Sequence, residues 1–509
     1  MKKYWKIVPI VLLALLGMSC DNSSSGSSVS DTTYTGDDSS DFVENETWSS
    51  TINIVWSGTD VTITGSADGV TVTNANGYVT INSTVKNIEY AVSGTGTGQL
   101  SIYSSYKFKL SLEGLTLACS DGPAINNQCS KTCYVVLGGT NTLSDGSSYA
   151  SSSEDRKAAF FSEGQLCFSG SGSLSVTGNY KHALASDDYI RFCSGTGTVD
   201  LTAKVSDGLH TNDGVIINDG TITINAVGEG IQCDTSSVVI TGGTIDITST
   251  TDKGILAYAN IEISGGTVNI SSKYKCIKTT SNLVISGGTI TAIATGTSSS
   301  SGTPEGIEAK GTITISGGTV YAQANDDAIN SGGNMTITGG YVMAYSTGND
   351  GIDANGNMYI KGGLVYAICA GGAEVALDAN TEDGYKLYVQ GGTLVAIGGL
   401  ENGASLSQNC YSASSWNKNT WYALTVGNNV FAFKTPSSGG TTMVVSGAST
   451  PTLKSGVTPS GTSIFNSMAY YPASVSGGSS VTLSSYSGGN AGGGPGGGGN
   501  PGGGPGGGR

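Results

Sequence analysis

A Gly-Gly-Thr triplet, or a close variant of it, recurs through the second half of this chain at nearly constant spacing. The third residues of the triplets are Thr221, Thr244, Thr267, Thr289, Thr319, Tyr341, Leu364 and Thr393. Successive third residues lie 23, 23, 22, 30, 22, 23 and 29 positions apart. A constant period interrupted by two insertions is typical of a solenoid, in which one repeat position occupies the same place on every rung.

Apolar and polar residues alternate on both sides of each triplet. Residues 261–263 (Ile-Glu-Ile) precede one triplet, and residues 268–270 (Val-Asn-Ile) follow it. Such alternation predicts short β-strands with one buried face, and the paired glycines supply the corner between them. A third segment, such as residues 350–352 (Asp-Gly-Ile), opens each rung and contributes one more inward aliphatic side chain.

Three short strands and three turns in each period predict an all-β fold, a right-handed parallel β-helix over residues 47–405. A leucine-rich repeat would need a leucine consensus with a helical segment, and neither is present. Residues 415–486 break the repeat and are expected to form a small β cap, because solenoid ends expose unpaired strand edges. Residues 487–509 are nearly all Gly, Pro and Asn, a composition that predicts disorder.

The N-terminal residues have the pattern of a bacterial lipoprotein signal. Residues 1–6 carry three lysines, residues 7–16 are apolar, and Cys20 follows the sequence Gly-Met-Ser at residues 17–19. The apolar stretch is shorter than the roughly 20 residues of a membrane span, so residues 1–19 are predicted to be a signal peptide. We expect lipidation at Cys20 and a flexible tether over residues 20–46. Localisation at a bacterial cell envelope, with a lipid anchor at the outer membrane or cell surface, follows from this pattern. Ordinary secretion is the alternative.

The chain is acidic and has few residues suited to transition metals. Its formal net charge of −15 argues against nucleic acid and anionic membranes as partners and favours cations. There are only two histidines, which argues against a transition-metal site. The ten cysteines form no CxxC pair, so the nine beyond Cys20 are expected to be buried apolar residues rather than zinc ligands or a disulfide framework.

Acidic residues recur at equivalent positions of successive rungs. Rungs stack about 4.8 Å apart, so repeated carboxylates face one another, which is costly unless they are protonated or bridged by a cation. Calcium takes roughly six to eight oxygen ligands and suits such a column. The predicted calcium ligands are Asp187, Asp207, Asp213 and Glu229 in one group and Glu305, Glu308, Asp327, Asp350 and Asp353 in another. In this alignment Asp187, Asp213 and Asp234 share one column. The alternative is that Asp and Asn fill turns by bonding to the local backbone.

Tyrosines occupy outward positions of the later rungs. Tyr321 and Tyr366 follow their triplets, whereas Tyr359 and Tyr388 precede theirs. An outward tyrosine on a flat β surface offers a ring face and a hydroxyl group, both of which sugars use. These four residues are the predicted carbohydrate-binding residues, with the alternative that Tyr is simply common in strands.

Several segments resemble a known family. They are residues 158–162 (Ala-Ala-Phe-Phe-Ser), 170–174 (Gly-Ser-Gly-Ser-Leu), 179–188 (Asn-Tyr-Lys-His-Ala-Leu-Ala-Ser-Asp-Asp) and the Asp/Glu-Gly-Ile openings of later rungs. The chain resembles the carbohydrate-binding β-helix proteins typified by a clostridial cellulose- and pectin-binding protein, whose fold is similar to that of pectate lyases. The resemblance implies a parallel β-helix that binds calcium and plant-type polysaccharide without established catalysis.

These observations favour a monomeric, surface-anchored, calcium-dependent protein that binds plant cell-wall glycans such as polygalacturonate or cellulose and is not catalytic. A polysaccharide lyase is one alternative, with Lys253, Lys275 and Lys278 as the only plausible bases for removing a C5 proton. An adhesin or scaffold whose acidic face meets a protein is the other.

Overall fold

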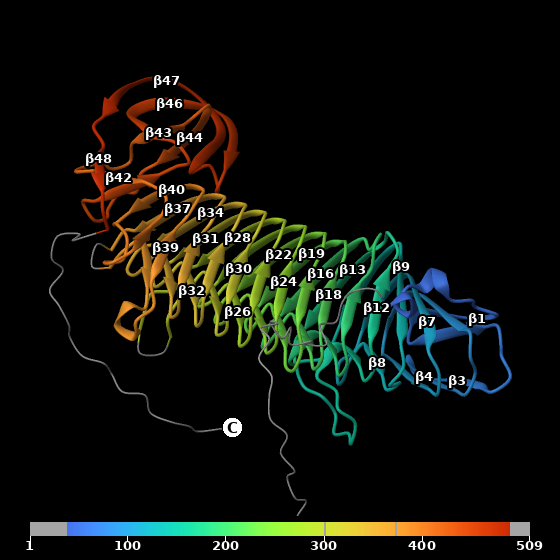
Figure 1. Cartoon of the computed structure of the whole chain (residues 1–509). Helices are drawn as coiled ribbons and strands as arrows, with labels where there is room; N and C mark the ends of the chain where they lie inside the picture. The colour runs from blue at the N-terminus through green and yellow to red at the C-terminus, as the bar shows by residue number, and fades with distance from the viewer. Residues whose placement is uncertain (1–37, 300–301, 372–373, 489–509) are drawn as a thin grey trace, which may run out of the picture. The chain divides into compact units, whose positions relative to one another are not determined.

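The protein is described here by a computed structural model that covers residues 38–299, 302–371 and 374–488. Short strands stack rung upon rung in three ladders, so that the chain advances as a parallel β-solenoid (Figure 1). The first ladder starts with an antiparallel pair, β3 (Val70–Ala75) and β4 (Tyr78–Ser83), and is parallel thereafter. The predicted all-β fold, a parallel β-helix with a β structure at the C-terminal end, is confirmed.

Each ladder contributes one strand to every rung. The first ladder continues through β6 (Gln99–Ser104), β8 (Ile125–Asn127), β11 (Ala158–Ser162), β14 (His182–Ser186), β17 (Leu209–Thr211), β20 (Ile231–Cys233), β23 (Ile255–Ala257), β26 (Ile277–Thr279), β29 (Ile307–Ala309), β32 (Ile329–Ser331), β35 (Ile352–Ala354) and β38 (Leu377–Ala379). The second contains β9 (Cys133–Gly138), β12 (Leu166–Ser169), β15 (Ile190–Phe192), β18 (Val215–Ile217), β21 (Val238–Ile240), β24 (Ile261–Ile263), β27 (Leu283–Ile285), β30 (Ile313–Ile315), β33 (Met335–Ile337), β36 (Met358–Ile360), β39 (Leu387–Val389) and β41 (Ser405–Leu406). The third contains β10 (Thr140–Ser144), β13 (Ser173–Gly178), β16 (Thr198–Ala203), β19 (Thr221–Ala226), β22 (Thr244–Ser249), β25 (Thr267–Ser272), β28 (Thr289–Ala294), β31 (Thr319–Ala324), β34 (Tyr341–Ser346), β37 (Leu364–Cys369) and β40 (Thr393–Ile397).

The repeat pattern explains the packing of a rung. Inward aliphatic residues such as Ile231, Ile240 and Ile245 are fully buried in one continuous core. The second glycine of a triplet takes positive φ, as at Gly243 (80°), where a side chain would be strained. At the first glycine, Gly265, an added Cβ would lie 2.2 Å from the Thr241 carbonyl oxygen, so the triplet is a structural corner. All nine cysteines of the described residues are buried.

The N-terminal end of the solenoid is closed by hairpins and a short covering segment. β1 (Ser50–Gly58) pairs antiparallel with β2 (Asp60–Thr64), and parallel with β5 (Ile88–Thr97), which leads to β7 (Phe108–Ala118). Two 3₁₀ turns, η1 (Ser39–Asp41) and η2 (Val43–Asn45), precede them.

The covering segment is held by a buried ion pair. Arg191 Nε lies 2.7 Å from Asp41 Oδ2, both side chains are buried, and the guanidinium lies 5.4 Å from the Phe42 ring centre. Residues 38–46, expected to belong to the flexible tether, therefore pack on the second ladder. The predicted signal peptide and Cys20 lie outside the described residues.

The C-terminal end changes to antiparallel pairing. β45 (Met443–Ser446) pairs antiparallel with both β40 and β42 (Cys410–Ala413), and β48 (Ser484–Tyr486) pairs with β42. Four strands form a closed antiparallel barrel: β43 (Trp421–Val426), β44 (Asn429–Lys434), β46 (Thr452–Ile464) and β47 (Ala469–Val481). One further 3₁₀ turn, η3 (Thr381–Asp383), lies in an insertion. In the part of the chain that the structure describes, no helix has the length and apolarity needed to span a membrane.

Candidate functional site

The strand register settles which acidic residues share a column. The outward column of the first ladder consists of Ala185, His210, Gln232, Leu256, Lys278, Glu308, Asn330, Asp353 and Asp378. The opening column lies two residues before each inward aliphatic side chain and consists of His182, Asp207, Glu229, Lys253, Lys275, Glu305, Asp327 and Asp350. The two columns lie next to each other, since Asp207 contacts His210, Lys275 contacts Glu308 and Asp327 contacts Asn330.

The assignment of Asp213 to the column of Asp187 and Asp234 was wrong. Ser186 pairs with Thr211, so Asn212, not Asp213, is the counterpart of Asp187, and Asp213 donates its N–H to the Asp188 carbonyl oxygen. Asp234 lies in the register of Asn212. The turn between the first two strands has three residues after β14 and β17 and four after β20, and it contributes no inward aliphatic residue that would fix the register.

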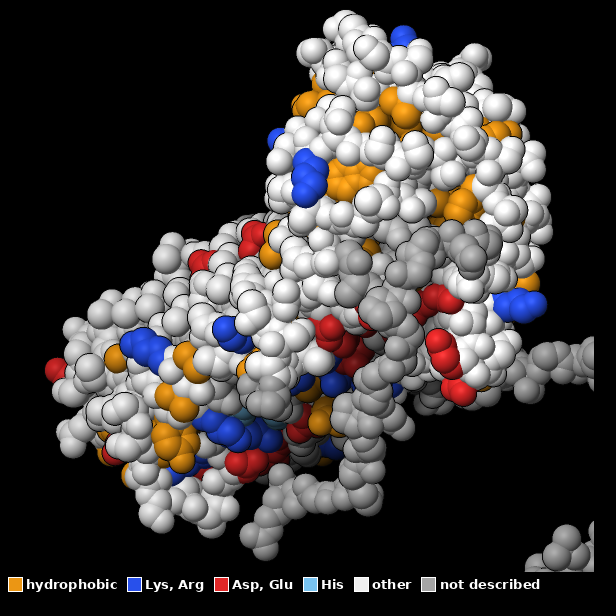
Figure 2. All heavy atoms as spheres, turned by 90° about the vertical axis from the view of Figure 1, so that its left-hand side faces the viewer, with side chains coloured by type: hydrophobic (Ala, Val, Ile, Leu, Met, Phe, Trp, Pro, Cys, Tyr) orange, Lys and Arg blue, Asp and Glu red, His pale blue; other side chains and the backbone are white. Residues whose placement is uncertain are grey.

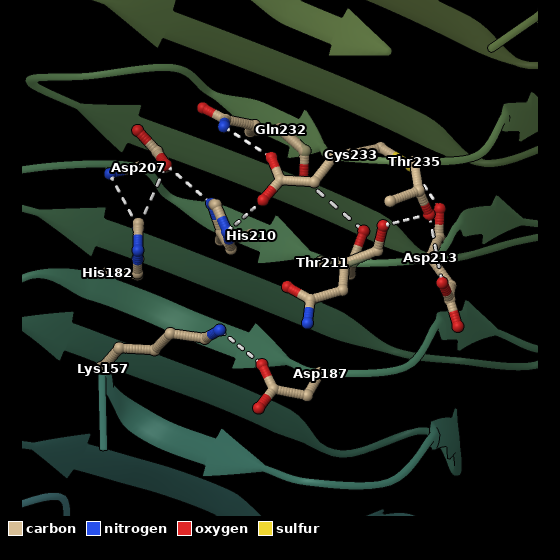
Figure 3. Close-up of polar contacts among 12 residues, drawn as sticks. Lys157, His182, Asp187, Asp207, His210, Thr211, Asp213, Gln232, Cys233 and Thr235 are labelled. Atoms are coloured by element: carbon tan, nitrogen blue, oxygen red, sulfur yellow. Dashed lines mark hydrogen bonds and ion pairs between the residues drawn. The ribbon is translucent and has the colours of Figure 1, made fainter. Parts of the chain in front are cut away.

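The first predicted calcium group is dispersed among separate partners (Figure 3). Asp187 forms an ion pair with Lys157. Asp213 accepts a hydrogen bond of 3.1 Å from Thr235 Oγ1, and Glu229 lies 3.0 Å from Lys253 Nζ. Each of these carboxylates therefore has its own local partner rather than a common centre.

Asp207, the fourth member, lies between two stacked imidazoles. Its Oδ2 is 3.1 Å from His182 Nδ1 and 3.0 Å from His210 Nδ1, and the ring centres are 4.2 Å apart (Figure 3). Burial lowers the pKa of His182 to about 4. Burial opposes ionisation of Asp207 too, but hydrogen bonds from both imidazoles hold its pKa below the usual value.

This His–Asp–His cluster is the part of the site that sequence reasoning missed. Within residues 38–299, 302–371 and 374–488 it is the one set of three His, Cys, Asp or Glu residues whose ligand atoms all lie within 4.8 Å of one another. The signal was available, because His182 stands in the opening column directly before Asp207, and His210 follows three residues later. Two nitrogen ligands suit calcium poorly, since calcium prefers oxygen.

The second predicted group divides into a compensated and an uncompensated part. Lys275 Nζ lies 2.8 Å from Glu305 and 3.4 Å from Glu308, and Lys278 Nζ lies 3.3 Å from Glu308. Lys310 also pairs with Glu308. Burial still raises the pKa of Glu305 to about 7. These two glutamates are neutralised by protein cations, which leaves little need for a metal ion.

The uncompensated part, here called the acid ladder, consists of Asp327, Asp350, Asp353 and Asp378. None of the four forms an ion pair with a lysine, arginine or histidine of the described residues. Burial raises their pKa values, and the neighbouring carboxylates raise them further, to about 6 for Asp327, about 8 for Asp350, about 7 for Asp353 and about 9 for Asp378. Figure 2 shows acidic side chains gathered at this end of the solenoid.

Amide groups hold the acid ladder in place. Asn330 Nδ2 donates to Asp327 Oδ2 (2.8 Å) and to Asp353 Oδ2 (3.0 Å), and so joins two rungs. The Val375 N–H donates to Asp350 Oδ1 at 2.9 Å. Rotation of the Asn330 amide would present its oxygen in place of its nitrogen. The residues present are thus carboxylate and amide oxygen donors, the set that calcium takes.

Two of the four predicted sugar-binding tyrosines are buried, which corrects that prediction. Tyr321 is 4% exposed and Tyr366 is fully buried, because the C-terminal barrel packs on the outward face of the third ladder. The Tyr366 ring lies 5.1 Å from that of Phe433, and its hydroxyl donates to the Lys434 carbonyl oxygen at 2.8 Å. Neither ring face is available to a glycan.

The other two tyrosines remain together on the second ladder and are here called the Tyr platform. The Tyr359 and Tyr388 rings are half-buried and stacked, with centres 5.0 Å apart and planes 10° from parallel. Lys361 Nζ lies 4.8 Å from the centre of the Tyr359 ring. Tyr359 belongs to the rung of Asp353 and Tyr388 to the rung of Asp378, so the Tyr platform lies on two of the three rungs that carry the acid ladder.

Two comparisons with known proteins give a match. Residues 73–351, just over half of the chain, match the family described as carbohydrate-binding domain-containing protein. Among solved structures, a polysaccharide lyase-like protein from C. thermocellum, studied as a gadolinium derivative, has 22% sequence identity and a TM-score of 0.38, covering 52% of this chain and 96% of its own. No curated protein matches.

Proposed function

Since the chain belongs to the family of carbohydrate-binding domain-containing proteins, we propose that it binds an acidic or cellulosic plant cell-wall polysaccharide with the help of calcium, at the acid ladder and the Tyr platform. Polysaccharide binding in general rests on the family. Calcium, the glycan class and the place of binding rest on the site.

The observation that carries the proposal is the acid ladder. Asp327 and Asp350 are each 5% exposed and stand on adjacent rungs without a cationic partner among the described residues. Carboxylates so placed stay protonated or need a cation, because burial and like charge both disfavour ionisation. Calcium would bring positive charge to this end and could itself hold a glycan carboxylate or hydroxyl group beside the Tyr platform.

Affinity gels test the proposal directly. The mature chain is run through gels containing polygalacturonate or cellulose, in calcium and in EDTA. We expect retardation by at least one of these glycans in calcium and less retardation in EDTA. Migration that is unaffected by every glycan under both conditions would contradict the function.

A second prediction concerns the contribution of the Tyr platform to glycan binding. Tyr359→Ala combined with Tyr388→Ala is expected to weaken glycan binding about tenfold, or about 1.4 kcal/mol, because two stacking faces are lost. Isothermal titration in calcium measures the change. Tyr258→Ala removes an isolated tyrosine that is 52% exposed and serves as the matched control. Equal affinities of the double variant and the control would exclude the platform as a sugar contact.

The anchor is part of the proposal. Cys20 would carry lipid and hold a monomeric solenoid at the cell envelope. Cells fed a labelled fatty acid should incorporate label into the wild-type chain and not into Cys20→Ser. Equal incorporation would place the lipid elsewhere.

Ion pairing disfavours the lyase alternative. Lys253 contacts Glu229 and Asp252, and its pKa is raised by the hydrogen bond to Asp252 and the charge of Glu229, even though burial opposes this. Lys275 and Lys278 are held by Glu305 and Glu308. A base that removes a C5 proton must be neutral near working pH. Absence of an ultraviolet-absorbing unsaturated product from polygalacturonate is therefore expected.

A further inference from the structure

A groove of about 460 Å³ lies near the N-terminal end of the solenoid, far along the chain from the acid ladder. It follows the corner between the first and second ladders, where β6 leads to β7. Its lining residues are Lys86, Asn87, Tyr106, Lys107, Ser130, Lys131, Thr132 and Gln165. This volume is in the range of small-ligand sites, and the residues are here called the lysine groove.

Three lysines gather here on a chain whose net charge is −15. Lys107 forms an ion pair with Glu46, which lies on the segment that covers the second ladder. The Lys107 Nζ to Glu46 Oε1 distance is 2.5 Å. Lys86 and Lys131 are exposed, and neither forms an ion pair with an acidic group of the described residues. Two positive charges in one concavity that form no ion pair within the described part of the chain are available to an anionic ligand.

An exposed aromatic ring completes the groove. Tyr106 is 39% exposed, and Lys86 Nζ lies 4.9 Å from its ring centre, which holds the ammonium group at the ring. The tyrosine offers a flat surface for the apolar face of a sugar ring, and the flanking ammonium groups can donate hydrogen bonds to carboxylate oxygens.

We propose that the lysine groove binds a carboxylate-bearing segment of a polysaccharide directly, without calcium, through Lys86 and Lys131 with a sugar ring against Tyr106. The inference rests on the proposed polysaccharide binding and adds a second site that selects uronate over neutral sugar. Its charge is opposite to that of the acid ladder, so the two sites differ in their response to chelator and to salt. Binding at the groove persists in EDTA and weakens with salt. The Debye screening length falls from about 10 Å at about 0.1 M salt to about 3 Å at about 1 M salt.

Titration of tetragalacturonate into the full mature chain in EDTA isolates this site from any calcium site. The wild type should bind the oligomer, and Lys86→Ala combined with Lys131→Ala should bind it about tenfold more weakly, as expected for the loss of two charge-assisted contacts. Lys204→Ala combined with Lys454→Ala removes the same charge from two exposed lysines outside the groove and should bind like the wild type. Tetraose from cellulose tests selectivity and should bind more weakly than the uronate oligomer. Unchanged thermal midpoints of both double variants show that they are folded.

The result decides between the two sites. No binding of tetragalacturonate by the wild type in EDTA, or equal affinities of the two double variants, overturns the lysine groove even if calcium-dependent retardation on polymer gels persists. Conversely, the wild type could bind tetragalacturonate in EDTA and yet show no extra retardation on polymer gels when calcium is added. That result would overturn the acid ladder as a calcium-dependent site and leave the lysine groove in place. Stronger groove-dependent binding to vesicles of phosphatidylglycerol than to the uronate would assign the site to lipid headgroups and reject the glycan.

Discussion

Replacing Tyr366 by alanine is expected to lower the free energy of unfolding by about 3–5 kcal/mol, the usual cost of removing a fully buried aromatic ring. The ring packs between the third ladder and Phe431 and Phe433 of the barrel, and its hydroxyl satisfies the Lys434 carbonyl oxygen. Denaturant unfolding followed by tryptophan fluorescence measures the change, since Trp421 lies on the barrel strand β43.

Tyr359→Ala is the variant to compare with Tyr366→Ala. Tyr359 is half-buried and lies on the second ladder, so its loss should cost much less stability and should weaken glycan binding instead. The two variants are thus expected to separate a structural tyrosine from a binding one. A Tyr366→Ala protein of unchanged stability and reduced glycan affinity would show that the barrel does not cover the third ladder in solution.

Neutralising Asp350 with asparagine is expected to stabilise the calcium-free protein at about pH 8 by about 1–3 kcal/mol, because each pKa unit corresponds to about 1.4 kcal/mol. The folded-state pKa of Asp350 is raised to about 8 from an ordinary value of 3.8, by burial first and by Asp327 second. Asparagine keeps the oxygen that accepts the Val375 N–H.

The pH dependence has a definite sign. Below the unfolded-state pKa of 3.8, the Asp350 carboxyl group is protonated in both the folded and the unfolded state. Between pH 3.8 and about pH 8, it is protonated in the folded state only. Stability in EDTA therefore falls as pH rises through this window and levels off above it. Thermal midpoints in EDTA across this range should decline for the wild type and decline less for Asp350→Asn.

Calcium should reverse the decline. At about one hundred times its Kd, a calcium ion bound only to the folded state adds about 2.7 kcal/mol, and Asp350→Asn should lose most of that gain. Asp60→Asn, at an exposed position of β2, should behave like the wild type in both conditions. Destabilisation of Asp350→Asn in EDTA would mean that the carboxylate is ionised and satisfied without a metal ion.

The repeat made the ladders predictable from sequence. Inward aliphatic residues fix strand register, because a one-residue slip would move them all to the outer face. For that reason the outward column from His210 to Asp353 could be written down from the spacing alone and agrees with the observed pairing. Asp213 was misplaced because the turn before the second strand carries no inward residue to count from.

The repeat spacing does not predict contacts between segments that lie far apart in the sequence. Tyr321 and Tyr366 were expected to contact sugar, but Met343 and Val395, which share their column, are apolar and already indicated a covered face. The covering barrel begins at residue 421, outside the period. Likewise, the pairing of Lys275 and Lys278 with Glu305 and Glu308 depends on two adjacent columns, which a single-column alignment does not relate. The lysine groove arises at a corner of the early rungs, where spacing is irregular.

The regular rise of the solenoid also sets a distance between its two candidate glycan contacts. In the first ladder, β6 at the lysine groove and β35 at the acid ladder are separated by ten pairing steps. Ten steps at about 4.8 Å amount to about 48 Å. A glycan long enough to reach both would bind with avidity through effective concentration, and shorter chains would use one contact at a time. Deleting one whole rung between them would shorten this span by about 4.8 Å while leaving each contact intact, so chain-length preference can change independently of sugar preference.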